Sequence, residues 1–430
     1  MARPYDLCVE ISLLSGWLPW TLRILALVAV AAALARISPF WLRRRLPWVV
    51  GGSIGLTALT ALLVALVGGV DDPLPFGLWF WLCCALLGLG GLAAGLRNSS
   101  WWNLAAVPVA AGLSLLCAAN SLNISTGYYP SVDAAVGDLS GAPVPQQMSL
   151  DEARNTVGKA TEGRVVQVDI PAEPSGFKHR RELVYLPPAW FRSKVRPKLP
   201  VLEMIGGQYA APDNWIRAGE AIKTADEFAA AHNGFAPILV MVDATGSFKT
   251  DTECVNGAHG KAEDHLVKDI PQYMEKTFDT ATGPRSWGVI GWSMGGTCAV
   301  DLAVVHPDVF GRFVDISGDD GPNVGSKQVT IAQLYGGDAA AWEAHDPATV
   351  LGKAKKGVYQ NSTGLFVVGD QETEKHLTAA QNLDKAAKAA GLTTEVRVRP
   401  GKHDWQLGSL AFKESLPWLA KEFGLPGVTG

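Results

Sequence analysis

The pattern of hydrophobic and polar residues divides the 430-residue chain into two halves. Charged residues are nearly absent from long stretches before Asn120 and frequent after Leu150. Crossing the hydrocarbon core of a bilayer takes roughly 20 helical residues. Four apolar stretches in the first half reach that length: Trp17–Ala35, Trp48–Val70, Phe76–Leu96 and Trp101–Ala119. The first lacks a small-residue cleavage site and three more follow it, so we expect four transmembrane helices and no signal peptide.

The pattern changes after the fourth stretch. Residues 121–155 are expected to form a linker, because Ser, Gly, Pro and Asn are frequent there without sustained periodicity. From residue 156 to 430, short apolar runs alternate with segments of helical spacing such as Ala221–His232, Val267–Thr277 and Ala379–Ala390. The runs are RVVQVDI, RELVYLP, LPVLEMIGG, APILVMVDA, SWGVIGWS, RFVDISG, GLFVVGD and TEVRVRP. This alternation predicts an α/β domain with a mostly parallel sheet flanked by helices, preceded by a transmembrane region over residues 1–120. The first two runs are expected to form an antiparallel pair at the sheet edge.

Charges in the short loops predict the orientation in the membrane. The loop between the first two spans carries Arg36, Arg43, Arg44 and Arg45. The next loop carries Asp71 and Asp72, and the third carries Arg97. Short loops rich in arginine stay in the cytoplasm. We therefore expect a multi-pass protein of the cell membrane whose second half lies on the extracytoplasmic side.

The net charge and the positions of the cysteines bear on which partners the protein can bind and on the compartment in which its second half lies. A formal net charge of -4 leaves no basic stripe for nucleic acid, so we expect no nucleic-acid partner. Of the six cysteines, Cys8, Cys83, Cys84 and Cys117 lie in or beside the spans, and Cys254 and Cys298 lie in the second half. An oxidising compartment would permit the last two to pair, and the sequence alone leaves that pairing open.

Ser293 lies in a pattern typical of a catalytic nucleophile. The stretch GWSMGG places it between Gly291 and Gly295, after the apolar run SWGVIGWS and before MGGTCAVDLAVVHP, which has helical spacing. A G-x-S-x-G pattern between a strand and a helix is a nucleophile elbow. A serine hydroxyl becomes a good nucleophile only when a base takes its proton and an acid orients that base.

The base and the acid are expected on loops after later strands. His403 follows the run TEVRVRP and a Pro-Gly turn, ahead of the terminal helix, and we predict that it is the base. Six other histidines are interpreted as surface or structural residues: His179, His232, His259, His265, His306 and His345 precede the serine, end its helix or lie in a polar segment. The loop after GLFVVGD offers Asp370, Glu372 and Glu374 as the acid, and spacing alone does not choose among them.

Acyl transfer also requires two backbone N–H donors for the developing oxyanion. One is expected from Met294, the residue after the nucleophile. The second is expected from the loop EMIGGQYAAPDNW, where Gly206 and Gly207 let the backbone approach a substrate closely. We choose Gly207 as this donor.

Several stretches from about Arg164 to Leu425 resemble the esterase D-like serine hydrolases, a group that includes the secreted mycolyltransferases of mycobacteria and corynebacteria. These stretches are ELVYLPPAW, VIGWSMGG, HPDVFGRFVDISG, LYGGD and PGKHDW, and they occur in the family order. The resemblance implies an α/β-hydrolase fold and chemistry on carboxylic esters without a metal or another cofactor. The family pattern G-x-x-D/E falls on residues 369–372, so the resemblance favours Glu372 as the acid, with Asp370 as the runner-up.

The resemblance extends to the substrate site. IGGQYAAPDNW is similar to the mycolyltransferase loop that supplies an oxyanion donor and touches trehalose, and HDW is similar to their HSW. This implies substrate-binding roles for Gln208 and Trp405. Gly207 replaces a larger residue of those enzymes, and the arginine that contacts trehalose has no clear counterpart here.

Together these patterns predict a membrane-anchored, extracytoplasmic serine esterase or acyltransferase. Its expected partners are membrane lipid and an acyl-ester lipid or acylated sugar of the cell envelope. The sequence leaves open whether water or a sugar hydroxyl takes the acyl group. The alternative is a non-catalytic envelope binding protein with a hydrolase-like fold. A transport role for the spans is disfavoured because Arg23 is their main ionisable residue, and it can snorkel to the interface.

Overall fold

The computed structural model describes residues 11–35, 40–67, 74–95, 100–158 and 160–428. It divides the chain into two compact units, Met1–Ser140 and Gly141–Gly430. Several residues used above lie outside the described residues: Cys8, Arg36, Asp71, Asp72 and Arg97, with the ends of the second and third predicted spans.

Four long apolar helices in the described part of the first unit are long and apolar enough to cross a membrane. They are α1 (Trp17–Leu34), α2 (Leu46–Val67), α3 (Phe76–Gly95) and α4 (Trp101–Thr126), and a π-helical turn over Trp41–Arg45 leads into α2. Small and medium apolar residues such as Ala26 and Ala110 form the shared core of α1, α3 and α4. The side-chain amide of Asn103 donates to the carbonyls of Ala32 and Ala35, which joins the start of α4 to the end of α1. The prediction of four long apolar helices is confirmed.

The segment over residues 121–155 contains short regular elements. The helix α4 continues to Thr126, and α5 (Val132–Leu139), β1 (Gln147–Met148) and α6 (Leu150–Asn155) follow. The serines that suggested an irregular segment cap these helices: Ser131 and Ser149 each accept a hydrogen bond from a backbone N–H in the first turn. The division into parts 1–120, 121–155 and 156–430 stays a prediction.

The second unit is built on a sheet of nine strands among the described residues, in the order β1-β2-β3-β5-β4-β8-β9-β10-β11. The bounds after β1 are β2 (Arg164–Val168), β3 (Glu182–Leu186), β4 (Val201–Ile205), β5 (Ile238–Val242), β8 (Trp287–Trp292), β9 (Arg312–Ile316), β10 (Thr363–Gly369) and β11 (Thr393–Arg399). β3 runs antiparallel to β2 and β5, and the other neighbours are parallel. Every predicted apolar run contains a strand, so the predicted fold class is confirmed. A short hairpin, β6 (Asn256–Gly257) and β7 (Gly260–Lys261), stands apart from the sheet.

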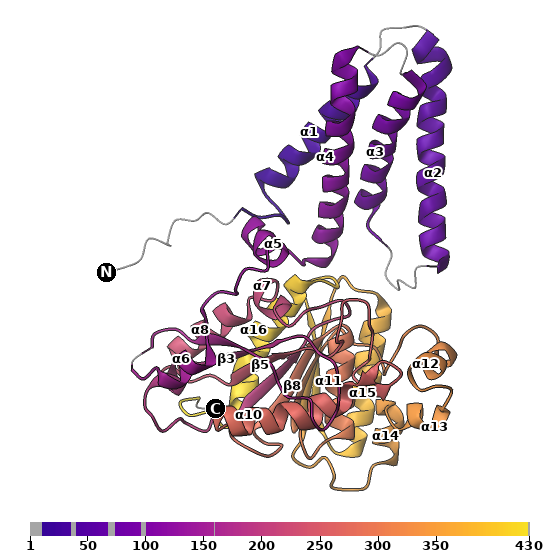
Figure 1. Cartoon of the computed structure of the whole chain (residues 1–430). Helices are drawn as coiled ribbons and strands as arrows, with labels where there is room; N and C mark the ends of the chain where they lie inside the picture. Colours follow the sequence, from indigo (N-terminus) through magenta and orange to yellow (C-terminus); the bar gives the residue numbers. More distant parts are fainter. Residues whose placement is uncertain (1–10, 36–39, 68–73, 96–99, 159, 429–430) are drawn as a thin grey trace. The chain divides into compact units, whose positions relative to one another are not determined.

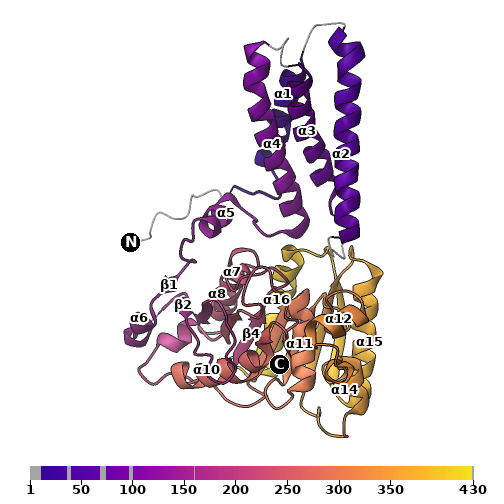
Figure 2. The same cartoon turned by 45° about the vertical axis from the view of Figure 1, so that its right-hand side comes forward.

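Helices cover both faces of this sheet, as Figures 1 and 2 show. The main ones are α8 (Ala221–Ala231), α10 (Ile270–Phe278), α11 (Met294–Val305), α15 (Glu374–Ala390) and α16 (Trp405–Glu422). On β9, the Arg312 side chain reaches the backbone of α16, whereas a Cβ at Gly296 of α11 would touch Asp315. Because successive residues of a strand point to opposite faces, α16 and α11 cover opposite sides of the sheet.

Shorter helices complete the second unit. They are α7 (Asn214–Arg217), α9 (Ala262–Asp264), α12 (Lys327–Leu334), α13 (Ala339–Glu343) and α14 (Pro347–Lys353), with a π-helical turn over His265–Asp269 and a 3-10 turn over Pro188–Phe191. The parallel strands share one direction, so the loops after β4, β5, β8, β9, β10 and β11 gather at one edge of the sheet. In open α/β sheets this edge carries the ligand site.

Candidate active site

Ser293 lies on a sharp turn between β8 and α11. Its backbone has φ 58° and ψ -123°, a region that residues other than glycine rarely occupy. Two glycines make the turn possible: a Cβ at Gly291 would lie 1.8 Å from the Gly295 carbonyl oxygen, and a Cβ at Gly295 would lie 2.4 Å from the Ile205 carbonyl oxygen. The G-x-S-x-G pattern is therefore a steric requirement of this turn, and the turn holds the serine at the sheet edge.

The structure brings the three predicted catalytic side chains together. His403 Nε2 lies 2.9 Å from Ser293 Oγ, and His403 Nδ1 lies 3.1 Å from Glu372 Oε1. A carboxylate only accepts hydrogen bonds, so Nδ1 carries the proton and Nε2 has a lone pair for the serine hydroxyl. The Glu372 side chain is only 1% exposed, whereas His403 is 20% exposed. The imidazole thus lies between a buried acid and an accessible hydroxyl.

The other two candidate acids have different places. Asp370 is exposed, and its Oδ1 accepts a hydrogen bond from the Gly401 N–H at 3.0 Å. Its own N–H donates to the Arg399 carbonyl. Asp370 thereby links the loop after β10 to the loop that carries His403. Glu374 is exposed at the first turn of α15. Of the three, Glu372 is the one that faces the imidazole.

The two predicted oxyanion donors flank the serine. Met294 is the first residue of α11, where a backbone N–H has no partner inside the helix and the helix dipole favours negative charge. A Cβ at Gly207 would lie 3.3 Å from the Ser293 Cβ, so the Gly207 backbone is adjacent to the nucleophile. The same Cβ would lie 2.9 Å from the Trp292 ring. The indole therefore occupies the space that a larger residue at position 207 would need.

Arg180 fixes the loop that carries Gly207. Its guanidinium donates to both carboxylate oxygens of Asp243 and, at 2.8 Å, to the Ala210 carbonyl. Burial raises the pKa of Asp243, but the hydrogen bonds and charge of Arg180 outweigh it and leave that pKa below its ordinary value. Sequence reasoning missed Arg180 because its acidic partner lies 63 positions away.

The two predicted substrate-binding residues differ in exposure. Gln208 is exposed beside Gly207, and its amide donates to Asp251 Oδ2 at 2.8 Å. Trp405 is fully buried, and its ring lies 4.8 Å from that of Trp292, measured between centroids. The contact of Trp405 with the site therefore runs through Trp292. Substrate binding by Gln208 and Trp405 stays a prediction.

Two aromatic rings that the sequence reasoning did not single out lie against His403. The Trp292 ring centroid is 5.2 Å from that of His403, and the His376 ring stacks on His403 at 4.9 Å with an angle of 15°. Trp292 could have been found because it is the first variable position of the G-x-S-x-G pattern. No local signal marks His376, because its place depends on how α15 packs.

Two groups of side chains in the described residues have the composition of a metal site: Glu372 with His376 and His403, and Glu182 with His179 and His265. In both groups the two imidazoles stack, at 15° in the first and 24° in the second. A histidine binds a metal through a lone pair in the plane of its ring. Nearly parallel rings do not favour such an arrangement, and in each group one carboxylate faces both histidines.

Cys254 and Cys298 form a disulfide with a Cα–Cα distance of 5.6 Å. The bond joins the loop after β5 to α11, the helix that begins directly after Ser293. The sequence left this pairing open because the partners lie 44 positions apart.

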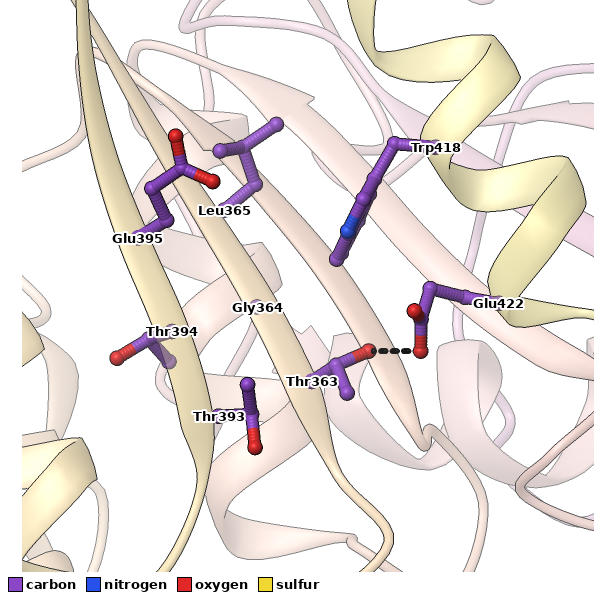
Figure 3. A pocket seen from close by; sticks show the side chains of 8 residues that line it. All are labelled: Thr363, Gly364, Leu365, Thr393, Thr394, Glu395, Trp418 and Glu422. Carbon is purple, nitrogen blue, oxygen red and sulfur yellow. Dashed lines mark hydrogen bonds between the residues drawn. The ribbon is translucent and has the colours of Figure 1, made fainter. Parts of the chain in front are cut away.

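A small pocket of about 120 Å³ lies elsewhere on the sheet (Figure 3). It is lined by the first residues of β10 and β11 and by Trp418 of α16, and the Thr363 hydroxyl donates to Glu422 at its floor. Glu372 and His403 follow the carboxyl ends of the same two strands. The pocket is therefore at the opposite end of the strands from Ser293.

Comparisons with known proteins identify the family to which the second unit belongs. The family model described as Esterase matches residues 178–419, which is more than half of the chain and includes Ser293, Glu372 and His403. An uncharacterised protein of Corynebacterium glutamicum is 31% identical over 325 residues, covering 73% of this chain and 75% of that protein. The diacylglycerol acyltransferase/mycolyltransferase Ag85A of Mycobacterium ulcerans is 26% identical over 230 residues, covering 45% of this chain and 66% of the relative.

A solved structure titled ferulic acid esterase has a similar fold. Its TM-score is 0.52 at 21% identity, and the alignment covers 61% of this chain and 99% of that structure. This likeness supports the α/β-hydrolase architecture of the second unit. The chain belongs to the Esterase family.

Proposed function

We propose that this protein is a membrane-anchored serine esterase or acyltransferase that acts on carboxylic acyl esters. The observation that carries the proposal is the 2.9 Å contact between Ser293 Oγ and His403 Nε2 at a strained elbow. Glu372 on the far nitrogen of the imidazole completes a Ser-His-Glu triad. The family assignment supports ester chemistry in general.

In the proposed mechanism, Ser293 Oγ attacks the ester carbonyl carbon while its proton passes to His403 Nε2. Glu372 stabilises the resulting imidazolium through Nδ1–H. The N–H groups of Met294 and Gly207 stabilise the tetrahedral oxyanion. When the intermediate collapses, the C–O bond to the alcohol breaks and His403 returns the proton to the leaving alkoxide. Water or a sugar hydroxyl then gives its proton to His403 and attacks the carbonyl carbon of the acyl-enzyme. When this second intermediate collapses, the bond from that carbon to Ser293 Oγ breaks and His403 gives the proton to Oγ, which regenerates the serine.

We further propose that the second unit is extracytoplasmic and acts on acyl-ester lipids or acylated sugars of the cell envelope. Arg43, Arg44 and Arg45 lie in the π-helical turn that leads into α2, which supports a cytoplasmic position for the loop between α1 and α2. The Cys254–Cys298 disulfide supports an oxidising compartment for the second unit. The membrane helices would keep the enzyme beside lipid substrates, and one relative is named as an acyltransferase.

The experiment that tests this function measures release of the alcohol from 4-nitrophenyl acyl esters by the full chain in membranes. We expect Ser293→Ala to abolish the release and Ser193→Ala, which changes an exposed serine outside the site, to leave it intact. Repeating the assay with sugar acceptors and following the acylated sugar by mass spectrometry separates transfer from hydrolysis. No release by the wild-type chain with any acyl length would favour a non-catalytic binding protein.

A further inference from the structure

We infer that His376 is a positioning residue of the site, which holds the second oxygen of Glu372 and supports the ring of the catalytic His403. This inference rests on the proposed function, because it assigns a partner to the proposed acid and base. His376 lies in the first turn of α15, two positions after the start of the helix at Glu374.

The first support is the environment of the Glu372 carboxylate. Oε1 is paired with His403, whereas the buried Oε2 makes no hydrogen bond to any of the described residues. His376 Nδ1 lies 3.7 Å from Oε2, longer than a hydrogen bond but within the range of a charge interaction. A buried carboxylate oxygen without a donor is costly, so a donor at this place stabilises the ionised acid.

The second support is the stacking of the two imidazoles. The rings of His376 and His403 lie 4.9 Å apart at an angle of 15°. His376 is buried, and its Nδ1 is 3.5 Å from the Thr373 hydroxyl at the cap of α15. A ring held at a helix start restricts rotation of the ring stacked on it. His403 thereby keeps Nδ1 on the acid and Nε2 on the serine.

The third support is a second copy of the arrangement in the same unit. Glu182 Oε1 lies 2.9 Å from His265 Nε2, and its Oε2 lies 3.6 Å from His179 Nδ1. The two histidine rings stack at 4.1 Å with an angle of 24°. That copy is buried in the core, where orienting an imidazole is a structural role. The unit therefore contains this arrangement of one glutamate and two stacked histidines twice, although in the core copy His179 also faces the backbone carbonyls of Arg180 and Ile170.

The charged groups around His376 determine how replacing it should change the pH dependence of the reaction. Glu372 and His403 face it from the loops after β10 and β11, and Asp319 interacts with it from the loop after β9. Asp319 is also paired with Lys375 at 2.8 Å. A proton on His376 competes with the His403 imidazolium for the negative charge of Glu372. Removing His376 removes this competition at any pH where His376 is charged.

The test compares His376→Phe and His376→Gln in the full chain by pH–rate profiles of kcat and KM for an acyl ester. Phe keeps a ring but cannot pair with Oε2, so we expect kcat to fall about tenfold and the acid limb to move to higher pH, with KM unchanged. Gln can donate to Oε2 without a ring, so we expect a smaller fall in kcat. His232→Phe, which changes a stacked histidine at the end of α8, serves as the matched control.

Wild-type kcat and an unmoved acid limb in His376→Phe would overturn the inference. If that variant does not fold, His376→Gln provides the test, because it also lacks the ring that stacks on His403. An unchanged kcat in His376→Gln would then contradict the positioning role. A wild-type chain without activity would instead overturn the proposed function, and this inference with it.

Discussion

Two clusters in the second unit contain the same kinds of side chains and differ in what they can do. One comprises Ser293, His403, Glu372 and His376, and the other, which we term the core cluster, comprises Ser175, His265, Asp269, Glu182 and His179. Each has a serine hydroxyl, a glutamate facing two histidines and a stacked pair of rings. Composition therefore does not distinguish an active site from a buried network.

The two clusters differ in the hydrogen-bond partners of the imidazole nitrogens and in exposure to solvent. Both nitrogens of His265 are bonded to carboxylates, Glu182 and Asp269, and its side chain is fully buried. Burial lowers the pKa of His265, but these two carboxylates outweigh it and raise that pKa above its ordinary value. An imidazolium held in this way has no lone pair to accept a proton. His403, in contrast, has one nitrogen facing a partly exposed serine at a strained turn.

The largest expected effect comes from His403→Gln. Removing the base of a triad lowers kcat by about 10⁴-fold or more while binding and oxyanion contacts remain. The partly exposed position of His403 predicts little change in the urea midpoint of unfolding. Activity assays and denaturation of the same preparation check both. Retention of more than a tenth of wild-type kcat would remove the functional contrast between the clusters.

His265→Phe tests the core cluster. The change leaves the carboxylates of Glu182 and Asp269 buried without their shared cation, which costs about 3–5 kcal/mol of unfolding free energy. Urea unfolding of the full chain in detergent, followed by tryptophan fluorescence, measures the loss. The kcat per active site, counted by covalent labelling, should stay near wild type. A stable variant with lost activity would show that the core cluster takes part in the chemistry.

Gly207→Ala tests a feature that only the active cluster has. The added Cβ would lie 2.9 Å from the Trp292 ring and displace the oxyanion donor, so kcat should fall about 10²-fold. Trp292→Leu removes the ring that the methyl group meets. The double variant should therefore be at least several-fold more active than Gly207→Ala alone. Strictly additive losses in the double variant would contradict this steric account.

A third carboxylate that faces two histidines predicts how the stability of the second unit depends on pH. Glu263 pairs with His306 at 2.7 Å and with His345 at 3.1 Å. Burial lowers the pKa of His345, but the hydrogen bond and charges around it outweigh burial and raise that pKa from 6.5 to about 9. Because the folded protein binds this proton more tightly than the unfolded chain, His345 adds to the free energy of unfolding. This contribution is fully present below pH 6.5 and is lost as the pH rises through about 9.

We therefore expect the unfolding free energy to fall by about 3 kcal/mol between pH 6.5 and 9.5 because of His345. In His345→Gln the fall should be smaller by that amount, because His265, whose pKa is also raised, still contributes to it. Urea midpoints of both proteins across this pH range provide the measurement. An equal slope in the two proteins would show that His345 is not held as a cation.

Local patterns sufficed for some features and failed for others. The apolar runs identified the strands of the sheet after β1, and the elbow identified Ser293, because both signals lie within a few residues. Spacing could not choose between Asp370 and Glu372, since the choice depends on the Gly401 N–H that binds Asp370. The core cluster could not be predicted from local sequence patterns, because Glu182 and His265 lie 83 positions apart. The short helices after residue 120 were missed because their capping serines are also typical of linkers.

The most direct test of the account is the position of covalent labelling by a fluorophosphonate, which reacts with activated serines. The full chain in membranes is treated with the probe, digested and mapped by mass spectrometry, with Ser293→Ala in parallel. The account predicts label on the peptide that contains Ser293, none on the peptide that contains Ser175, and no label on the variant. An unlabelled wild-type chain, or equal labelling of the variant, would contradict it.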